Sequence, residues 1–159
     1  MKKVLSSLLI LVVLLILLRI FVFSIWNIPG KVMYPLIHSN QKVLVLNKRW
    51  FKPKRGNIVI VRSEEKGRSY IRRIIAVEGD TLSIRHNVVS INGEILNEPY
   101  KFIDTNSKKC NFPEFMLLAI PGGEFFVMGD NRCIPSDFDS RVEGTVNENQ
   151  IQGKVIYIF

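Results

Sequence analysis

The sequence predicts a mostly β, antiparallel domain that follows an N-terminal transmembrane helix. An apolar run covers residues 4–26, which is long enough to cross a hydrocarbon core of about 30 Å as a helix. Beyond it come short runs rich in β-branched and aromatic residues, separated by turn signals, and no amphipathic pattern of three helical turns follows residue 27. A chain of 159 residues thus suits one β domain on a membrane tether.

The N-terminal run has two interpretations, an uncleaved anchor or a secretory signal peptide. Lys2 and Lys3 give it the basic start that both share. Arg19 and a run of Phe, Ile and Trp follow its apolar centre, where a cleavage site would need small residues. The sequence therefore predicts a single-pass plasma-membrane protein with an extracytoplasmic C-terminal domain. The predicted order is residues 1–3 in the cytoplasm, 4–26 in the membrane and 27–159 outside.

The strands of the domain are predicted from runs of β-branched and aromatic residues. Asn92-Gly93 is the clearest hairpin turn, because this pair adopts the backbone of a two-residue β-turn readily. The polar segment 101–115 is predicted to be a loop or a lobe on the core. Short connections favour antiparallel pairing. The predicted strands are 42–46, 57–62, 70–77, 81–85, 88–91, 124–128 and 154–159.

The charge of the chain favours an anionic partner surface. Lys and Arg number 22 against 14 acidic residues, a formal net charge of +8. The basic residues are scattered except in Lys48–Arg55 (KRWFKPKR), which fits a solvated loop or a site for anionic lipid. No nucleic-acid partner is expected, because one short basic run makes a poor nucleic-acid footprint.

Two cysteines and two histidines complete the candidate reactive groups. Cys110 and Cys133 lie in a domain predicted to be exported, so one disulfide and two free thiols both remain open. His38 and His86 have no Cys, Asp or Glu at ligand spacing. No metal site and no cofactor are expected.

Four stretches occur in an order that resembles a known family. They are IPGKVMYPL, RGNIVIV, YIRRIIAVEGD and GDNRCIPSDFDSR, supported by INGEILNEPY, IPGGEFFVMGDNR and IQGKVIYIF. Together they resemble the type I signal peptidases, membrane-anchored serine proteases that remove signal peptides from exported proteins. The resemblance extends over nearly the whole chain and implies a signal-peptidase-like fold. It places the neighbourhood of the former active site at Pro29, Met33, Pro35, Tyr70, Ile71, Arg73 and Ser136.

This sequence has neither the nucleophile nor the base at the two catalytic positions of that family. The family uses a Ser immediately before the Met as nucleophile and a Lys immediately before an Arg as base, whereas this chain has Val32 and Arg72 there. Valine has no lone pair to attack a carbonyl, and arginine keeps its proton in proteins. No catalytic residue is therefore assigned, and the sequence favours a protein that is not an enzyme.

The closing motif of the family also departs from its pattern. Two extra residues separate its two halves, so Ser136 matches the family's supporting Ser in neither register. We expect Arg73 to form an ion pair, and Arg72 to find a carboxylate partner in residues 137–139, because an unpaired buried guanidinium is costly. The residues expected to hold the fold through turns and charged hydrogen bonds are Gly129, Asp130, Asn131, Arg132, Asp139, Ser140 and Arg141.

Three functions are compatible with these features. The leading hypothesis is an inactive signal peptidase I-like membrane protein that binds an exported precursor or a pilin, because family members without the dyad are linked in Gram-positive bacteria to pilus assembly beside sortases. The first alternative is an active signal peptidase with a displaced nucleophile, such as Ser39. The second is a lipid- or envelope-binding module that uses Lys48–Arg55 at the membrane surface.

Overall fold

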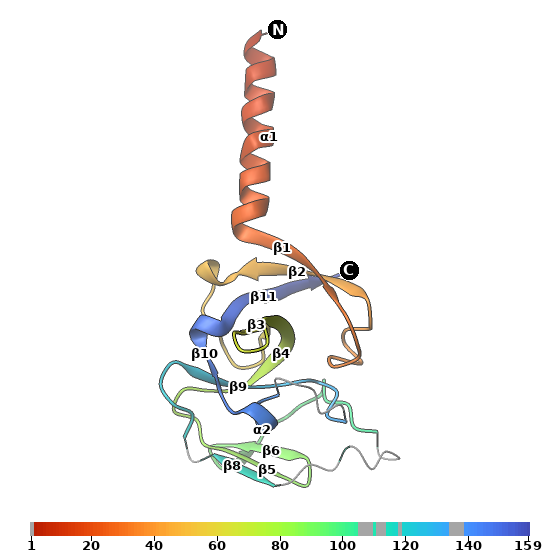
Figure 1. The fold of residues 1–159 in the computed structure, drawn as a ribbon, viewed down its shortest axis with the longest axis vertical. Coiled ribbons are helices and arrows are strands. Elements are labelled where there is room, and N and C mark those ends of the chain that lie inside the picture. The colour runs from red at the N-terminus through yellow and green to blue at the C-terminus, as the bar shows by residue number, and fades with distance from the viewer. Residues whose placement is uncertain (1, 105–109, 111–113, 118, 134–138) are drawn as a thin grey trace.

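The computed structural model describes residues 2–104, 110, 114–117, 119–133 and 139–159, without the side chains at 2, 18, 20 and 117. A helix, α1 (Lys2–Val22), projects from a body of two antiparallel sheets. In Figure 1, β1, β2 and β11 lie next to α1, and the smaller sheet lies at the far end of the body. The apolar core of the body therefore begins directly beneath the foot of the helix.

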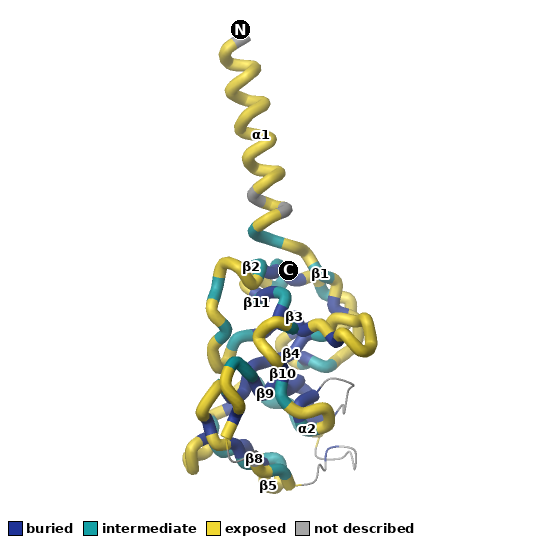
Figure 2. The backbone as a smooth tube through the Cα atoms, turned by 60° about the vertical axis from the view of Figure 1, so that its left-hand side comes forward, coloured by how far each residue is buried: buried dark blue, intermediate teal, exposed yellow. Residues whose placement is uncertain are grey.

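Most of helix α1 is exposed, as the colour of its backbone in Figure 2 shows. The large apolar residues from Val4 to Leu17 are 44–74% exposed. Over the described residues, no helix is both long enough and apolar enough to cross a membrane.

The predicted span is wrong in its last four residues. The helix ends at Val22, and β1 (Phe23–Ile28) begins at once. All six residues of β1 pair antiparallel with β2 (Gln41–Asn47). Hydrophobicity continues across the change from helix to strand, so the apolar run alone did not reveal it.

The larger sheet has the strand order β1-β2-β11-β3-β4-β9-β10, with antiparallel pairing throughout. The last long strand, β11, lies between β2 and β3, so the C-terminal strand is an inner strand of the sheet. Six consecutive residues of β4 are buried, because β4 is a central strand between β3 and β9. The remaining bounds are β3 Ile58–Ser63, β4 Arg68–Val77, β9 Glu124–Met128, β10 Val146–Asn147 and β11 Ile151–Ile158.

The smaller sheet has the order β7-β6-β5-β8. The predicted hairpin at Asn92-Gly93 is confirmed: the two residues have φ of 54° and 86°, as a type I′ turn requires, and they join β6 to β7. The outer residues of this sheet alternate with inner ones that pack on Phe126 of β9. The bounds are β5 Leu82–Arg85, β6 Val88–Ile91, β7 Glu94–Ile95 and β8 Phe115–Leu117.

All seven predicted strands are present, with ends that differ by three residues at most. Strand β1 was missed because it continues the apolar run, and β8 and β10 were missed because each has only two or three residues. Strand β7 was predicted only as the second arm of the Asn92-Gly93 hairpin. The described helical elements after α1 are single turns: α2 (Ser140–Glu143), η1 (Lys48–Trp50) and η3 (Glu148–Gln150).

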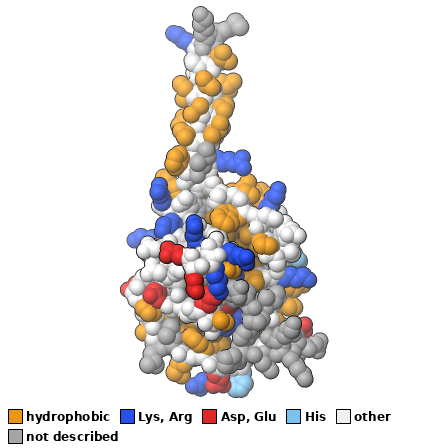
Figure 3. All heavy atoms as spheres, in the orientation of Figure 1, with side chains coloured by type: hydrophobic (Ala, Val, Ile, Leu, Met, Phe, Trp, Pro, Cys, Tyr) orange, Lys and Arg blue, Asp and Glu red, His pale blue; other side chains and the backbone are white. Residues whose placement is uncertain are grey.

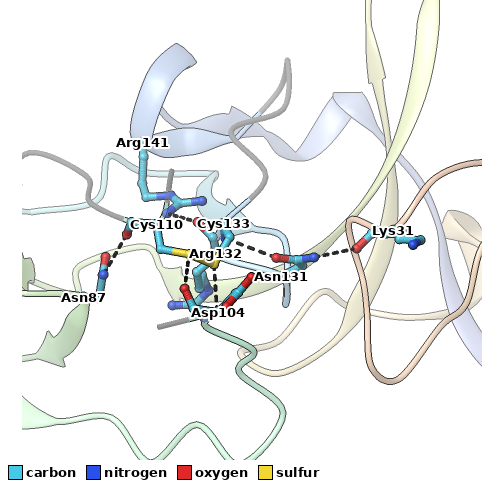
Figure 4. Close-up of a disulfide and its surroundings, with 8 residues drawn as sticks. All are labelled: Lys31, Asn87, Asp104, Cys110, Asn131, Arg132, Cys133 and Arg141. Atoms are coloured by element: carbon cyan, nitrogen blue, oxygen red, sulfur yellow. Dashed lines mark hydrogen bonds between the residues drawn. A yellow bond between two sulfur atoms is a disulfide. The ribbon is translucent and has the colours of Figure 1, made fainter. Parts of the chain in front are cut away.

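The two cysteines form a disulfide, Cys110–Cys133, which decides between the alternatives left open by the sequence. Figure 4 shows it beside Asp104, whose backbone N–H lies 3.0 Å from Cys133 Sγ. The backbone N–H of Phe102 donates to Asp130 O (2.9 Å), and that of Arg132 donates to Phe102 O (3.0 Å). The segment after β7 and the loop after β9 are thus joined both by backbone hydrogen bonds and by the disulfide.

A buried carboxylate, Asp80, connects three turns of the body. It accepts hydrogen bonds from the backbone N–H of Val77 (2.8 Å), from Arg55 Nη2 (2.7 Å) and from Asn92 Nδ2 (3.0 Å). Burial alone would raise the pKa of Asp80, but these donors outweigh it and hold that pKa below its ordinary value of 3.8. The charged form is therefore favoured by folding.

Acid is accordingly expected to weaken the fold through Asp80. Because the folded pKa is lowered, its contribution is present above the unfolded pKa of about 3.9 and is lost as pH falls through the folded pKa. We expect Asp80→Asn to reduce the free energy of unfolding by about 1–3 kcal/mol at pH 7, and to show a smaller further loss at pH 3 than the unmodified chain. Denaturant unfolding followed by circular dichroism measures both, with the exposed Glu94→Gln as control. If Asp80→Asn and the unmodified chain lost the same free energy of unfolding between pH 7 and pH 3, this role of Asp80 would be contradicted.

Candidate functional site

The loop after β1 places Val32 between the core and the segment after β9. Its neighbour Met33 is 1% exposed and packs with Val43 and Ile58, which fixes the loop to the larger sheet. The backbone N–H of Asn131 donates to Val32 O (2.9 Å), and its Nδ2 donates to Lys31 O (3.2 Å). The second of these bonds is visible in Figure 4. Two distant motifs of the sequence are thus joined at the position where a nucleophile would stand.

Gly129 lies against this loop so closely that it has no room for a side chain. A Cβ built on Gly129 would lie 2.9 Å from Val32 O and 3.1 Å from Val32 Cγ1. The first contact is with backbone, which cannot rotate away. The glycine therefore permits the close approach of the loop and the segment after β9.

Substitution of Gly129 by Ala is expected to displace the Val32 loop. We expect the free energy of unfolding to fall by about 1–3 kcal/mol, because overpacking in a tight site forces backbone to move. Thermal unfolding measures this loss. The matched control is Gly122→Ala, where the nearest atoms are those of the Glu78 side chain at 3.7 Å or more. A loss no larger than that of the control would show that the loop tolerates the added methyl group.

Strand β4 carries Arg72 into the protein interior. Arg72 is 2% exposed, its Nη1 donates to Ile71 O (2.6 Å), and its Cζ lies 5.6 Å from the centre of the Tyr70 ring. The guanidinium is thus enclosed, as expected for a side chain that replaces a buried lysine. The predicted carboxylate partner in residues 137–139 falls largely outside the described residues, and within them Asp139 pairs with Arg141.

Val32 and Arg72 line the same cavity, of about 130 Å³, beneath β1. The tertiary structure therefore brings together the two positions at which the family pattern would place nucleophile and base. Pro29, Tyr70 and Ile71 of the predicted neighbourhood also line the cavity. The remaining lining residues, which the sequence did not indicate, are Trp26, Asn27, Ile28, Ile60 and Ser69.

The other residues of the predicted neighbourhood lie elsewhere. Met33 belongs to the core, Pro35 is exposed, and Arg73 pairs on the side of β9. Ser136 falls outside the described residues. Trp26, Asn27 and Ile28 escaped prediction because the apolar run was assigned to the membrane or to its edge; the β-branched and aromatic composition of 23–28 was the only available signal.

The described residues that line the cavity do not form the pair of a hydroxyl and a base that peptide hydrolysis requires. Ser69 supplies a hydroxyl, but its Oγ donates to Gln152 Oε1 (2.7 Å), an amide oxygen that is too weak a base to activate it. Ser39 is not a lining residue, and its Oγ accepts the backbone N–H of Gly30 (3.2 Å). Among the described lining residues there is no carboxylate, histidine or lysine. This arrangement can enclose a small apolar group, but it offers no base beside a hydroxyl.

Arg73, next to Arg72, forms the predicted ion pair. Its Nε and Nη2 bond to Asp130 Oδ1 and Oδ2 at 2.7 and 2.6 Å, and its Nη1 donates to Gly56 O (2.9 Å). Its Cζ also lies 3.9 Å from the centre of the Tyr100 ring. Burial raises the pKa of the Asp130 carboxyl above its ordinary value, against the opposing effect of Arg73 and Arg132. The pair is a buried structural brace for the loop that holds Val32.

A second buried pair, Arg132–Glu98, lies beside the first. Arg132 Nη1 bonds to Glu98 Oε2 (3.2 Å), Nη2 bonds to Glu98 Oε1, and Nε donates to Gly129 O (2.9 Å). Burial and the charge of Glu98 raise the pKa of the Tyr100 hydroxyl, which donates to Glu98 Oε1 (3.2 Å). The two arginines therefore fix both sides of the turn that contains Gly129.

Asp139, Ser140 and Arg141, the last members of the predicted structural group, lie at the N-terminal end of α2. Asp139 accepts from Arg141 Nε (2.8 Å) and Nη2 (2.9 Å), and also from the backbone N–H of Gly129 (3.3 Å). Ser140 Oγ accepts the backbone N–H of Val127 (2.9 Å). The hydrogen bonds expected of this group are present, and they support the loop rather than any reacting atom.

Comparison with known proteins agrees with the motifs and the fold. The chain matches, over residues 1–159, the family model described as signal peptidase, peptidase S26. Signal peptidase I of Bacillus licheniformis is 31% identical over 97% of this chain and 86% of its own length. Signal peptidase I T of Bacillus subtilis is 32% identical over 97% and 82% of the two chains.

A solved structure supports the same assignment. The crystal structure of a signal peptidase I from Enterococcus faecalis V583 is similar with a TM-score of 0.55 and 30% identity, covering 67% of this chain and 98% of that one. The matching fold, the similarity to the Bacillus proteins and the ordered motifs lead to one assignment. This chain belongs to the signal peptidase S26 family.

Proposed function

We propose that this chain is a catalytically inactive, signal peptidase I-like membrane protein that holds an extended segment of an exported protein. The observation that carries the proposal is the placement of Val32 and Arg72 in one cavity. Loss of a nucleophile alone costs on the order of a millionfold in rate in a comparable catalytic unit. With the base position also occupied by a guanidinium, no useful hydrolysis is expected.

Binding does not depend on the missing groups. Strand β1 is the edge of the larger sheet, so its outer backbone N–H and C=O groups can pair with an extended peptide. The adjoining cavity of about 130 Å³ is lined largely by apolar side chains. Cavities of about 150 Å³ hold benzene in other proteins, so this one suits a small apolar side chain of the bound segment.

The membrane supplies the context in which such a segment would arrive. The 21 residues of α1 extend about 31 Å at a rise of about 1.5 Å per residue, and the large apolar side chains from Val4 to Leu17 are exposed. With α1 as a single anchor, the body lies outside the plasma membrane, where exported precursors emerge. An exported precursor or pilin is the client, and sortase machinery is the expected neighbour.

Site-specific photocrosslinking tests the proposal. A photoreactive residue at Ile25, exposed on β1, should capture an exported precursor in membranes, and mass spectrometry should show that the captured precursor keeps its signal peptide. The matched control is the same probe at Ile95, which is exposed on β7 of the other sheet. Val32→Trp, which fills the cavity, should lower the yield at Ile25.

The possible results separate the proposal from its alternative. Capture at Ile25 no greater than at Ile95 would overturn the binding role. A precursor trimmed by the unmodified chain would instead support an active signal peptidase, as the Bacillus relatives are named.

A further inference from the structure

Two adjoining cavities share Lys48, Arg49, Asn149 and Ile151 in their linings, and the larger one reaches Phe21 at the foot of α1. Their volumes are about 500 and 440 Å³. Lys48 and Arg49 line both, and Arg62 lines the first. We call these three residues the basic collar. Two acids, Glu64 and Glu148, line one cavity each, so cations predominate at the point where the cavities meet.

The collar lies at the level where α1 ends. Phe21, in the last turn of α1, lines the larger cavity. Trp50, next to Arg49, is 60% exposed, and its indole Nε1 donates to Phe21 O (3.4 Å). Exposed tryptophans favour the headgroup layer of a bilayer. Figure 3 shows Lys and Arg side chains gathered around the junction of α1 with the body.

We propose that the basic collar binds the phosphate of an anionic phospholipid headgroup. This inference rests on the anchoring role of α1 in the proposed function, but not on the peptide-holding role. Two guanidinium groups and an ammonium suit a phosphodiester, because guanidinium forks match its oxygen geometry. Lys48 Nζ is already positioned by a hydrogen bond to Asn149 O (3.4 Å).

The amide side chains around the collar suit the rest of a phosphatidylglycerol headgroup. Asn149, Gln150 and Gln152 line the larger cavity and can bond to glycerol hydroxyls. The later cations of the predicted Lys48–Arg55 run do not belong to the collar. Arg55 is committed to Asp80, and neither Lys52 nor Lys54 lines these cavities. The structure therefore selects the beginning of that basic run as the lipid site.

Native mass spectrometry of the full-length chain tests the site. The protein is released from detergent micelles that contain equal amounts of phosphatidylglycerol and phosphatidylcholine, and the ratio of the two retained lipids is measured. Each cation near an anionic leaflet contributes about a factor of five. We therefore expect Lys48→Gln with Arg49→Gln to lower the preference for phosphatidylglycerol by about 25-fold. The control is Lys52→Gln with Lys54→Gln, which removes the same charge from exposed positions of the same segment.

Each result has a defined meaning. Strong preference in the unmodified chain and in the control, lost only in the collar variant, supports the site. An equal loss in both variants would show a diffuse charge effect, and no preference in the unmodified chain would remove the site altogether. Displacement of the lipid by an equal concentration of inorganic phosphate would assign the collar to free phosphate instead. Circular dichroism of both variants checks that they fold, and photocrosslinking at Ile25 should be unchanged by the collar variant.

Discussion

The double variant Val32→Ser, Arg72→Lys is expected to cleave an exported precursor that the unmodified chain leaves intact. Serine restores a hydroxyl at the cavity, and a lysine at position 72 would be desolvated by Ile60 and Ile71, which lowers its pKa toward neutrality. General base catalysis alone contributes about 10²–10⁴-fold. We therefore expect cleavage on the order of 10²–10⁴-fold above the unmodified chain, measured as processed precursor by mass spectrometry.

The two single variants are the controls for this experiment. Val32→Ser lacks a neutral base, and Arg72→Lys lacks a nucleophile, so neither should cleave measurably. Cleavage by the unmodified chain would contradict the inactive assignment and direct attention to Ser69, the serine that lines the cavity. Cleavage by the Arg72→Lys single variant would also indicate that the Ser69 hydroxyl acts as the nucleophile.

Replacement of Asp130 by Asn is expected to destabilise the body by about 3–5 kcal/mol, because it leaves the buried charge of Arg73 without a counterion. Asp130 is fully buried, and Arg73 is 8% exposed. The amide can accept one hydrogen bond from the guanidinium, but it supplies no negative charge. Denaturant unfolding at neutral pH gives the change in the free energy of unfolding.

Replacement of an exposed carboxylate is the control for the stability loss of Asp130→Asn. Glu114, whose side chain is 60% exposed and lies 3.9 Å from His86, should change stability by less than about 0.5 kcal/mol when replaced by Gln. If Asp130→Asn reduced stability no more than Glu114→Gln, the Arg73–Asp130 pair would not stabilise the loop that contains Val32. The partner variant Arg73→Met leaves Asp130 unpaired and should be similarly destabilising.

The sequence predicted the strands that are long enough to show a pattern. Runs such as 70–77 and 124–128 combine β-branched and aromatic residues, and these preferences are local. Strand β1 was hidden, because the same apolar composition serves a helix in lipid and a strand on a core. Strands of two or three residues, such as β10, depend on their partners and leave no local signal.

That Val32 and Arg72 occupy the family's nucleophile and base positions stays a prediction from the sequence, made through the order of motifs around them. That Arg73 would pair was predicted too, but its particular partner, Asp130, was not. Pairing between residues 57 positions apart depends on how β4 and β9 align. The disulfide was undecided for the same reason, since spacing alone does not fix the distance between two cysteines.

By itself, the sequence determined which side chains stand at the two positions that match the family's nucleophile and base, and the identity of a side chain decides whether it can donate a lone pair or accept a proton. Only the tertiary structure decided where those side chains meet. It brought Val32 and Arg72 to one cavity, made β1 an open edge beside it, and gathered Lys48, Arg49 and Arg62 at the foot of α1. The physical reason is that reactivity belongs to single residues, whereas cavities, edges and charge clusters arise from long-range packing.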